Sequence, residues 1–288
     1  MMFKNLIIQG RDIQTTTLKD LAKLSGAAAI SAIASQNIHH QAFRMSNADD
    51  RTLATIAPIC AAAELDFGFI PASRDINDFK LLVMDMDSTL ITIECIDEVA
   101  DLNNIKPQVA AITAAAMRGE IEFSESLNRR VALLAGLDES VLQQVYEQRL
   151  QLSPGAETLL RTLQQHGIKT LLVSGGFTFF TNRLQARLNL DYSKANNLEI
   201  SNGKLTGRVL GDILDAQAKA DWLVRIGAQL GISRNQIIAI GDGANDLLML
   251  KQAGVSIAYH AKPIVREQAA YALNFNDLSA VLPLLGQT

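Results

Sequence analysis

The feature that most constrains this chain is a short apolar run followed at once by two acids. Residues 79–84, Phe-Lys-Leu-Leu-Val-Met, are rich in apolar side chains and show no alternation with polar ones. Such a run is typical of a buried strand in a parallel sheet. Asp85 and Asp87 come directly after it, where open α/β sheets bind their ligands. In a strand, residues i and i+2 share a face, and two carboxylates there repel each other unless a cation or a shared proton holds them. The motif therefore indicates chemistry rather than packing.

Composition limits the classes of protein that this chain can belong to. Its 288 residues are 48% hydrophobic, which predicts a globular protein with one large domain and a smaller one. The net charge of −4 argues against nucleic acid or an acidic membrane as partner, because both require a basic patch. Cys60 and Cys95 lack the spacing of a metal site and are expected to be reduced thiols. Without a signal-like start or a long apolar run, we expect a cytoplasmic protein.

Residues 1–75 are expected to form a separate α+β module. Their pattern predicts the order strand, helix, strand, strand, helix, strand, which is that of a ferredoxin-like split unit. In order and size this module resembles the amino-acid-binding ACT domains, a resemblance that rests on element order alone. Pro71 to Asp75 would be the linker. The predicted strands are 6–8, 27–33, 38–45 and 67–70, and the predicted helices are 17–24, ended by Gly26, and 49–65.

From residue 78 onward, strands alternate with helices, which predicts a Rossmann-like, doubly wound parallel sheet. Further buried strands are expected at 171–173 and 237–240, and a β-hairpin at 196–209 around Asn202-Gly203. Two helices are expected to begin at capping side chains, Ser153 and Asp215.

The segment 96–152 is almost entirely helical in pattern and interrupts the sheet region after its first strand. An insertion at this place can lie over the strand ends and act as a lid. We therefore expect a core formed by 78–95 and 153–288, and a helical cap formed by 96–152.

Polar residues of the right types follow three predicted strands. The first strand presents Asp85 and Asp87, the second Ser174-Gly175-Gly176, and the third the run 241–246, Gly-Asp-Gly-Ala-Asn-Asp. Converging acids form the all-oxygen site that Mg²⁺ prefers, while the hydroxyl and amides after the second strand can cradle a phosphate. Lys219 would add a positive charge. Each piece alone is an ordinary turn or a solvated side chain. Their joint occurrence after buried strands favours phosphoryl transfer through a carboxylate nucleophile.

These four motifs resemble those of the haloacid dehalogenase-like superfamily over residues 78–288. The resemblance implies a mobile cap and magnesium-dependent phosphoryl transfer, with Asp85 as the nucleophile and Asp87 as the general acid and base. It further implies the following ligands: Asp85, Asp242 and the backbone carbonyl of Asp87 for Mg²⁺, and Ser174, Gly175, Lys219 and Asn245 for the substrate phosphate.

The segment 116–131 resembles the cap of the phosphoserine phosphatase family, as do the runs 85–94 and 174–177. The resemblance implies that Glu94 accepts from the ammonium of phosphoserine and that Arg130 binds its carboxylate with a two-pronged fork. Met117 and Phe123 would exclude water when the cap closes. The implied reaction releases serine and phosphate as the last step of serine biosynthesis.

Two other functions stay open at this stage. The chain could be a phosphatase or phosphotransferase for another small phosphomonoester, or an amino-acid-sensing protein with a vestigial phosphatase core; the complete set of acids argues against the second. By analogy with ACT domains, the front module is a hypothetical site for serine binding or for homodimer formation.

Overall fold

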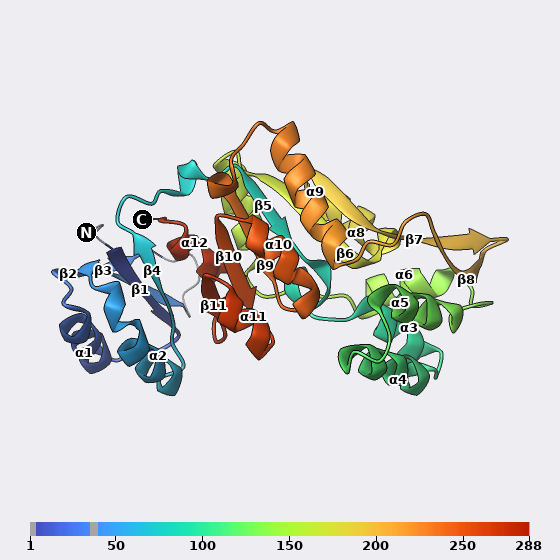
Figure 1. Ribbon diagram of the computed structural model, residues 1–288, viewed down its shortest axis with the longest axis horizontal. Coiled ribbons are helices and arrows are strands. Elements are labelled where there is room, and N and C mark those ends of the chain that lie inside the picture. The colour runs from blue at the N-terminus through green and yellow to red at the C-terminus, as the bar shows by residue number, and fades with distance from the viewer. Residues whose placement is uncertain (1–3, 35–39, 288) are drawn as a thin grey trace.

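The computed structural model describes residues 4–34 and 40–287, which form two sheets with helices around them (Figure 1). The larger sheet has the strand order β11-β10-β9-β5-β6-β7-β8. Its pairs are parallel, except that β7 and β8 form an antiparallel hairpin. Its strands are β5 (Leu81–Met84), β6 (Lys169–Phe177), β7 (Tyr192–Ser201), β8 (Lys204–Leu210), β9 (Ile237–Gly241), β10 (Val255–Tyr259) and β11 (Tyr271–Leu273).

Strand β5 lies at the centre of this sheet, with β9 on one side and β6 on the other. Every residue of β5 and β9 is buried, as expected for strands covered by helices on both faces. Chain order reverses at β5, so this strand stands at the switch point where such sheets bind ligands. The prediction of a doubly wound sheet is confirmed. The helices are α7 (Ala156–Gln165), α8 (Thr178–Leu188), α9 (Ala216–Gln229), α10 (Leu247–Gln252), α11 (Pro263–Gln268) and α12 (Val281–Leu284).

The predicted helical insertion is present as a group of four helices beyond one end of the sheet (Figure 1). Its two connections to the sheet region lie side by side, because Ile91 and Leu152 form an antiparallel bridge and Thr92 donates its N–H to Gln151. The limits 96–152 remain a prediction. The helices are α3 (Cys95–Leu102), α4 (Lys106–Met117), α5 (Phe123–Ala132) and α6 (Ser140–Gln148).

One of the two predicted helix caps is wrong. Helix α7 begins at Ala156, and its cap position is held by Gly155 at φ +78°, not by Ser153. A Cβ at Gly155 would lie 2.5 Å from the backbone nitrogen of Ser279, so close packing and a positive φ both require glycine there. The other cap is confirmed, since the Asp215 side chain accepts from the N–H of Ala218 at 2.9 Å.

The N-terminal residues form a four-stranded antiparallel sheet of order β2-β3-β1-β4, with helices α1 and α2 packed together against it (Figure 1). This arrangement confirms the ferredoxin-like prediction. The predicted strand 38–45 starts outside the described residues, and β3 itself is shifted toward the C-terminus. The elements are β1 (Lys4–Gly10), α1 (Thr15–Ser25), β2 (Ala29–Ile33), β3 (Gln41–Ala48), α2 (Leu53–Ala62) and β4 (Asp66–Pro71).

The two sheets meet along their edge strands, β4 and β11. The hydroxyl of Tyr271 donates to the carbonyl of Phe69 at 3.1 Å, and a Cβ at Gly68 would lie 2.6 Å from the Tyr271 ring. Asp66, which is 1% exposed, accepts from the backbone N–H groups of Asn274, Phe275 and Asn276 and from the side-chain amide of Asn276. The module is therefore docked on the core by buried, charge-assisted hydrogen bonds.

We expect Asp66→Ala to lower the free energy of unfolding by about 3 kcal/mol, because it leaves buried N–H groups without an acceptor. Urea denaturation followed by circular dichroism measures this loss. Asp50→Ala is the control: its ion pair with Lys4 is 4.0 Å long and exposed, so a change below about 0.5 kcal/mol is expected. Equal effects of the two substitutions would contradict the role given to Asp66.

Among the described residues, no helix is both long enough and apolar enough to cross a bilayer.

Candidate active site

The first acidic motif lies in a wide turn that follows β5. The strand ends at Met84, so the expectation that Asp85 and Asp87 share a strand face is wrong. Asp85 takes an extended conformation and its Oδ1 accepts from the N–H of Met86 at 2.7 Å. Asp87 Oδ1 accepts from the N–H of Cys95 at 3.1 Å, at the start of α3. Ser88, at φ +56°, donates its N–H to the carbonyl of Ile93, which closes the turn just before α3. The turn thus presents both acids at the carboxyl end of the central strand.

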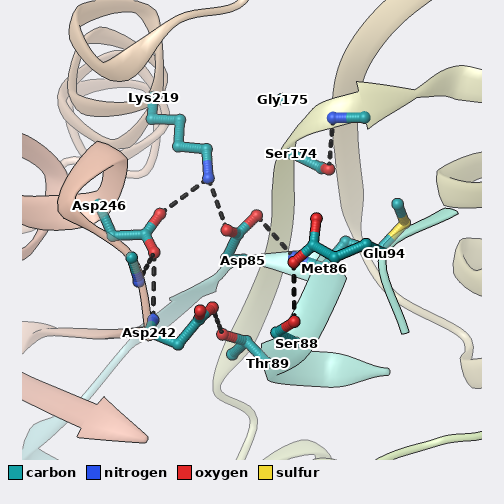
Figure 2. A network of polar contacts seen from close by, with 12 residues as sticks. Asp85, Met86, Ser88, Thr89, Glu94, Ser174, Gly175, Lys219, Asp242 and Asp246 are labelled. Atoms are coloured by element: carbon teal, nitrogen blue, oxygen red, sulfur yellow. Dashed lines mark hydrogen bonds and ion pairs between the residues drawn. The ribbon is translucent and has the colours of Figure 1, made fainter. Parts of the chain in front are cut away.

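Three carboxylates gather at this end of the sheet. Asp85, Asp242 and Asp246 each offer one oxygen, and these oxygens lie within 4.8 Å of one another (Figure 2). Asp242 and Asp246 come from the loop after β9, the strand next to β5. The metal ligands expected from the sequence, Asp85, Asp242 and the carbonyl of Asp87, do not include Asp246, although the run 241–246 ends at that residue.

Lys219 connects two of these acids. Its side chain is 1% exposed, and its Nζ lies 2.7 Å from Oδ2 of Asp85 and 2.7 Å from Oδ1 of Asp246 (Figure 2). Burial alone would lower the pKa of Lys219, but the two carboxylates outweigh it and the pKa lies above the ordinary lysine value. One ammonium against three carboxylates leaves the cluster anionic.

The buried acids have raised pKa values. Burial, followed by the charge of Asp246, raises the pKa of Asp85 well above its ordinary value. Burial also raises the pKa of Asp242 to about 6, even though the hydroxyl of Thr89 donates to its Oδ1 at 2.8 Å. The pKa of Asp87 rises to about 7, mainly through burial and then through the charge of Glu94. The pKa values rise because negative charge is buried here without enough positive charge to compensate it. The same uncompensated charge favours binding of a cation.

The phosphate-loop candidates, Ser174 and Gly175, lie on the neighbouring strand. The pairing of β6 with β7 is interrupted between Val173 and Phe177, so these residues bulge out of the ladder. Ser174 is fully buried and its Oγ accepts from the N–H of Gly176 at 2.8 Å. A Cβ at Gly176 would lie 2.8 Å from Oδ2 of Asp87. The loop backbone therefore approaches the acids closely, and only glycine permits this approach.

Two of the predicted substrate-binding residues, Glu94 and Arg130, lie near the acidic motif. Glu94, which precedes α3, accepts from the hydroxyl of Ser88 at 2.7 Å (Figure 2). Arg130 on α5 is half-buried. Burial lowers its pKa, whereas the nearby charges of Asp97 and Glu94 oppose that shift. The carboxylate of Glu94 and the guanidinium of Arg130 are therefore close enough for their opposite charges to compensate each other in part.

The other predicted contacts differ in where the structure places them. The Phe123 ring lies against the phosphate loop, since a Cβ at Gly175 would be 3.1 Å from its Cζ. Met117, the last residue of α4, is 68% exposed, so its side chain faces mainly solvent. Asn245 is half-buried and its Oδ1 lies against Gly243, within the loop that carries Asp242.

Comparison with known proteins identifies the family. The model of the haloacid dehalogenase-like hydrolases matches residues 79–254, and a protein named phosphoserine phosphatase from Polaromonas sp. (strain JS666) is 54% identical over 215 residues, covering 73% of this chain and 91% of the relative. The chain belongs to the haloacid dehalogenase-like hydrolases, among the phosphoserine phosphatases. A further family model, a domain of unknown function designated DUF4072, matches residues 6–56 of this hydrolase.

Solved structures of the family cover different shares of the chain. A haloacid dehalogenase family hydrolase from Salmonella enterica serovar Typhi is 34% identical, covers 98% of both chains and has a TM-score of 0.89. A structure described as a phospho-aspartyl intermediate analogue of phosphoserine phosphatase is 40% identical, covers 71% of this hydrolase and 98% of that chain, and has a TM-score of 0.67. The similarity thus includes the N-terminal sheet in the first case.

Proposed function

We propose that this chain hydrolyses O-phospho-L-serine to L-serine and inorganic phosphate, as the last step of serine biosynthesis. The observation that carries the proposal is the position of Lys219 between Asp85 and Asp246, at the edge where Asp242 joins them. Support also comes from relatives that are named phosphoserine phosphatase. One of the solved relatives is described as an analogue of a phospho-aspartyl intermediate.

The acid cluster fits Mg²⁺ by the chemistry of its donors. Its three carboxylates supply hard oxygen ligands and excess negative charge, and Mg²⁺ combines a few such ligands with water and phosphate oxygens. We propose that Asp85, Asp242 and the backbone carbonyl of Asp87 bind Mg²⁺ directly, with Asp246 beside them. When bound, Mg²⁺ would neutralise charge that develops on the transferring phosphoryl group.

In the first half of the proposed reaction, a carboxylate oxygen of Asp85 attacks phosphorus and the bond from phosphorus to the serine oxygen breaks. Lys219, Ser174 and the amide of Gly175 hold the phosphoryl oxygens, with Asn245 supporting them at the rim. Asp87, whose pKa of about 7 keeps a proton available near neutral pH, protonates the departing alkoxide. The products of this step are serine and an aspartyl-phosphate.

In the second half, water attacks the phosphorus of the aspartyl-phosphate. Asp87 is now ionised, so it accepts the proton of that water, and the bond from phosphorus to the Asp85 oxygen breaks. Free phosphate leaves, Asp85 is regenerated as a carboxylate, and Asp87 is again protonated. Two successive displacements at phosphorus, joined by the covalent intermediate on Asp85, replace a single direct attack of water on the ester.

Selection of phosphoserine is assigned to Arg130 of the cap and to Glu94, which lies just before the cap. Glu94 accepts from the ammonium of the substrate and Arg130 binds its carboxylate, so each charged end meets an opposite charge. Phe123, already packed against Gly175, would keep water from the reacting atoms. Met117 is exposed here, and its proposed part in closing the site requires movement of α4.

The deciding experiment measures phosphate released from phosphoserine with Mg²⁺ and with the metal chelated. The same assay on a panel of phosphothreonine, phosphoethanolamine and sugar phosphates tests the second candidate, a phosphatase for another small phosphomonoester. Preference for a panel member over phosphoserine would replace the proposed substrate, whereas no metal-dependent release from any ester would reject the phosphatase function.

We expect Mg²⁺ to bind about tenfold more weakly at pH 5 than at pH 7.5. The pKa of Asp242 in the metal-free protein is about 6, so below that pH a proton competes with the metal, and the affinity increases as pH rises through this range. Calorimetric titration in two buffers of different ionisation enthalpy measures both the affinity and the proton released. Affinity independent of pH would contradict a ligand role for Asp242.

Three further assignments belong to the proposal. The domain limits remain 1–75, 78–95 with 153–288, and 96–152. The N-terminal module is proposed to pair two copies of the chain, which sedimentation analysis would test.

A cytoplasmic location is supported by Cys60 and Cys95, which are both buried, unpaired thiols as expected in a reducing compartment.

A further inference from the structure

One buried amide side chain, which belongs to none of the four catalytic motifs, connects two parts of the active site. Asn196 lies on β7, is 1% exposed, and uses both ends of its side chain. Its Nδ2 donates to the carbonyl of Gly175 at 2.8 Å, and its Oδ1 accepts from the N–H of Leu214 at 2.7 Å. The first bond holds the phosphate loop, and the second holds the residue before the cap of α9.

The first bond replaces a missing part of the sheet ladder. Val173 pairs with Lys194 and Phe177 with Asn196, so three residues of β6 bulge out opposite a single residue of β7. The bulge brings Gly176 against Asp87, since a Cβ at Gly176 would lie 2.8 Å from Oδ2 of that acid, and it removes the carbonyl of Gly175 from regular pairing. The Asn196 side chain supplies the donor for that carbonyl, as a buried acceptor requires.

The second bond fixes the start of the helix that carries Lys219. Leu214 precedes Asp215, which caps α9 through the N–H of Ala218 and through its own carbonyl, the acceptor for the N–H of Lys219. Lys219 then extends to Asp85 at 2.7 Å. A shift of Leu214 would move the first turn of α9, and with it the root of the Lys219 side chain.

We infer that Asn196 is a positioning residue that sets the distance between the two phosphate-binding groups, the loop of Ser174 and Gly175 and the ammonium of Lys219. This inference rests on the proposed phosphatase function. Asn196 does not touch the reacting atoms itself. Because the Asn196 side chain is buried, water cannot easily replace its two hydrogen bonds when they are lost. The loop and Lys219 would then shift, and small displacements of groups that position a substrate reduce turnover strongly.

The test compares Asn196→Asp, which keeps an acceptor for Leu214 but loses the donor to Gly175, with Asn196→Ser, which shortens the side chain and removes both bonds. Inorganic phosphate is the probe, because it needs the loop and Lys219 but not the cap. We expect both variants to bind phosphate about tenfold more weakly, from the loss of a buried hydrogen bond, and to lose about 10- to 100-fold in kcat for phosphoserine. Mg²⁺ affinity should stay within about threefold, because each metal acid also has a bond that does not involve Lys219: Asp85 accepts from Met86, Asp242 from Thr89 and Asp246 from Gly243.

Thr170→Val is the matched control for lost stability. Thr170 is also buried, lies at the opposite end of β6, and bonds Asp191 through its hydroxyl. The control should lower the melting temperature while phosphate affinity and kcat stay unchanged. Two Asn196 variants that lower the melting temperature but keep wild-type phosphate affinity and kcat would overturn the inference. A wild-type protein that binds phosphate but hydrolyses no ester would instead reject the proposed function, while the phosphate titrations would still test Asn196.

Discussion

Asp85→Asn is expected to reduce turnover of phosphoserine by about 10⁴-fold or more, because it removes the carboxylate that is proposed to accept the phosphoryl group. Losses of this size are seen when a catalytic nucleophile is removed and the remaining groups still bind the substrate. The same substitution should leave binding of the ester nearly intact, since the phosphate loop, Lys219 and the cap remain. The prediction therefore separates chemistry from binding.

The structure also predicts that this variant stays folded. Oδ1 of Asp85 accepts from the N–H of Met86, and an amide oxygen at this position can accept in the same way. The amide nitrogen would replace Oδ2 beside Lys219 and cannot accept from its ammonium. Lys219 keeps its contact with Asp246 at 2.7 Å, so the buried ammonium is still paired with a carboxylate. One negative charge also disappears from a cluster in which Asp246 raises the pKa of Asp85. We expect a metal-free melting temperature within about 4 °C of the wild type.

Three measurements check this prediction: phosphate release under saturating substrate, circular dichroism melting without metal, and calorimetric binding of phosphoserine. Asp191→Asn is the matched control. Asp191 accepts from the N–H of Thr170 at 2.9 Å, at the far end of β6, and its loss should affect stability but not turnover. Substantial turnover by Asp85→Asn would reject the covalent route, because Asp85 is the sole nucleophile in the proposed mechanism.

The sequence predicted well those parts of the site that depend on short, local sequence patterns. Buried runs followed by Asp85, Ser174 and Asp242 placed three loops on one edge, because parallel strands end together whatever their exact length. The parallel sheet and the ferredoxin-like order followed from alternation and buried runs in the same way. Such local patterns determine the strands and helices without any knowledge of which side chains are in contact in the folded protein.

The parts that could not be predicted depend on contacts between distant residues. Asn196 is one polar residue in a hairpin strand, and its importance appears only when Gly175 and Leu214 lie on either side of it. The cap at Gly155 was missed because the reason for glycine is the approach of Ser279, more than a hundred residues later. The exposure of Met117 likewise reflects how α4 packs, which its apolar character does not determine.

Arg130→Ala is expected to lower kcat/KM for phosphoserine by about 100-fold or more, but to change kcat/KM for p-nitrophenyl phosphate by less than about threefold. Removing one partner of a desolvated charge pair costs several kcal/mol, because the other charge is left unpaired. The aryl ester has no carboxylate for Arg130 to bind, so it loses nothing there. The ratio of the two effects therefore isolates carboxylate recognition from any general disturbance of the cap.

The chain offers a close control one residue away. Arg129 lies on the same helix and carries the same charge, but its side chain is 54% exposed and pairs with Glu125 on the outer surface. Arg129→Ala should leave both substrates within about threefold of the wild type, since an exposed pair contributes little. Arg130→Lys should fall between the two alanine variants, because an ammonium keeps the charge but loses the planar fork.

Phosphoethanolamine completes the argument, because it keeps the ammonium and phosphate of phosphoserine and lacks only the carboxylate. The wild type should prefer phosphoserine over it by about the factor that Arg130→Ala loses, and the variant should treat the two esters nearly alike. Such a result would place Arg130 opposite the carboxylate and leave the ammonium to Glu94, which Ser88 holds at 2.7 Å. If Arg130→Ala slowed phosphoserine, phosphoethanolamine and the aryl ester equally, Arg130 would act by holding the cap in place, and the source of carboxylate selectivity would have to be sought on another side chain.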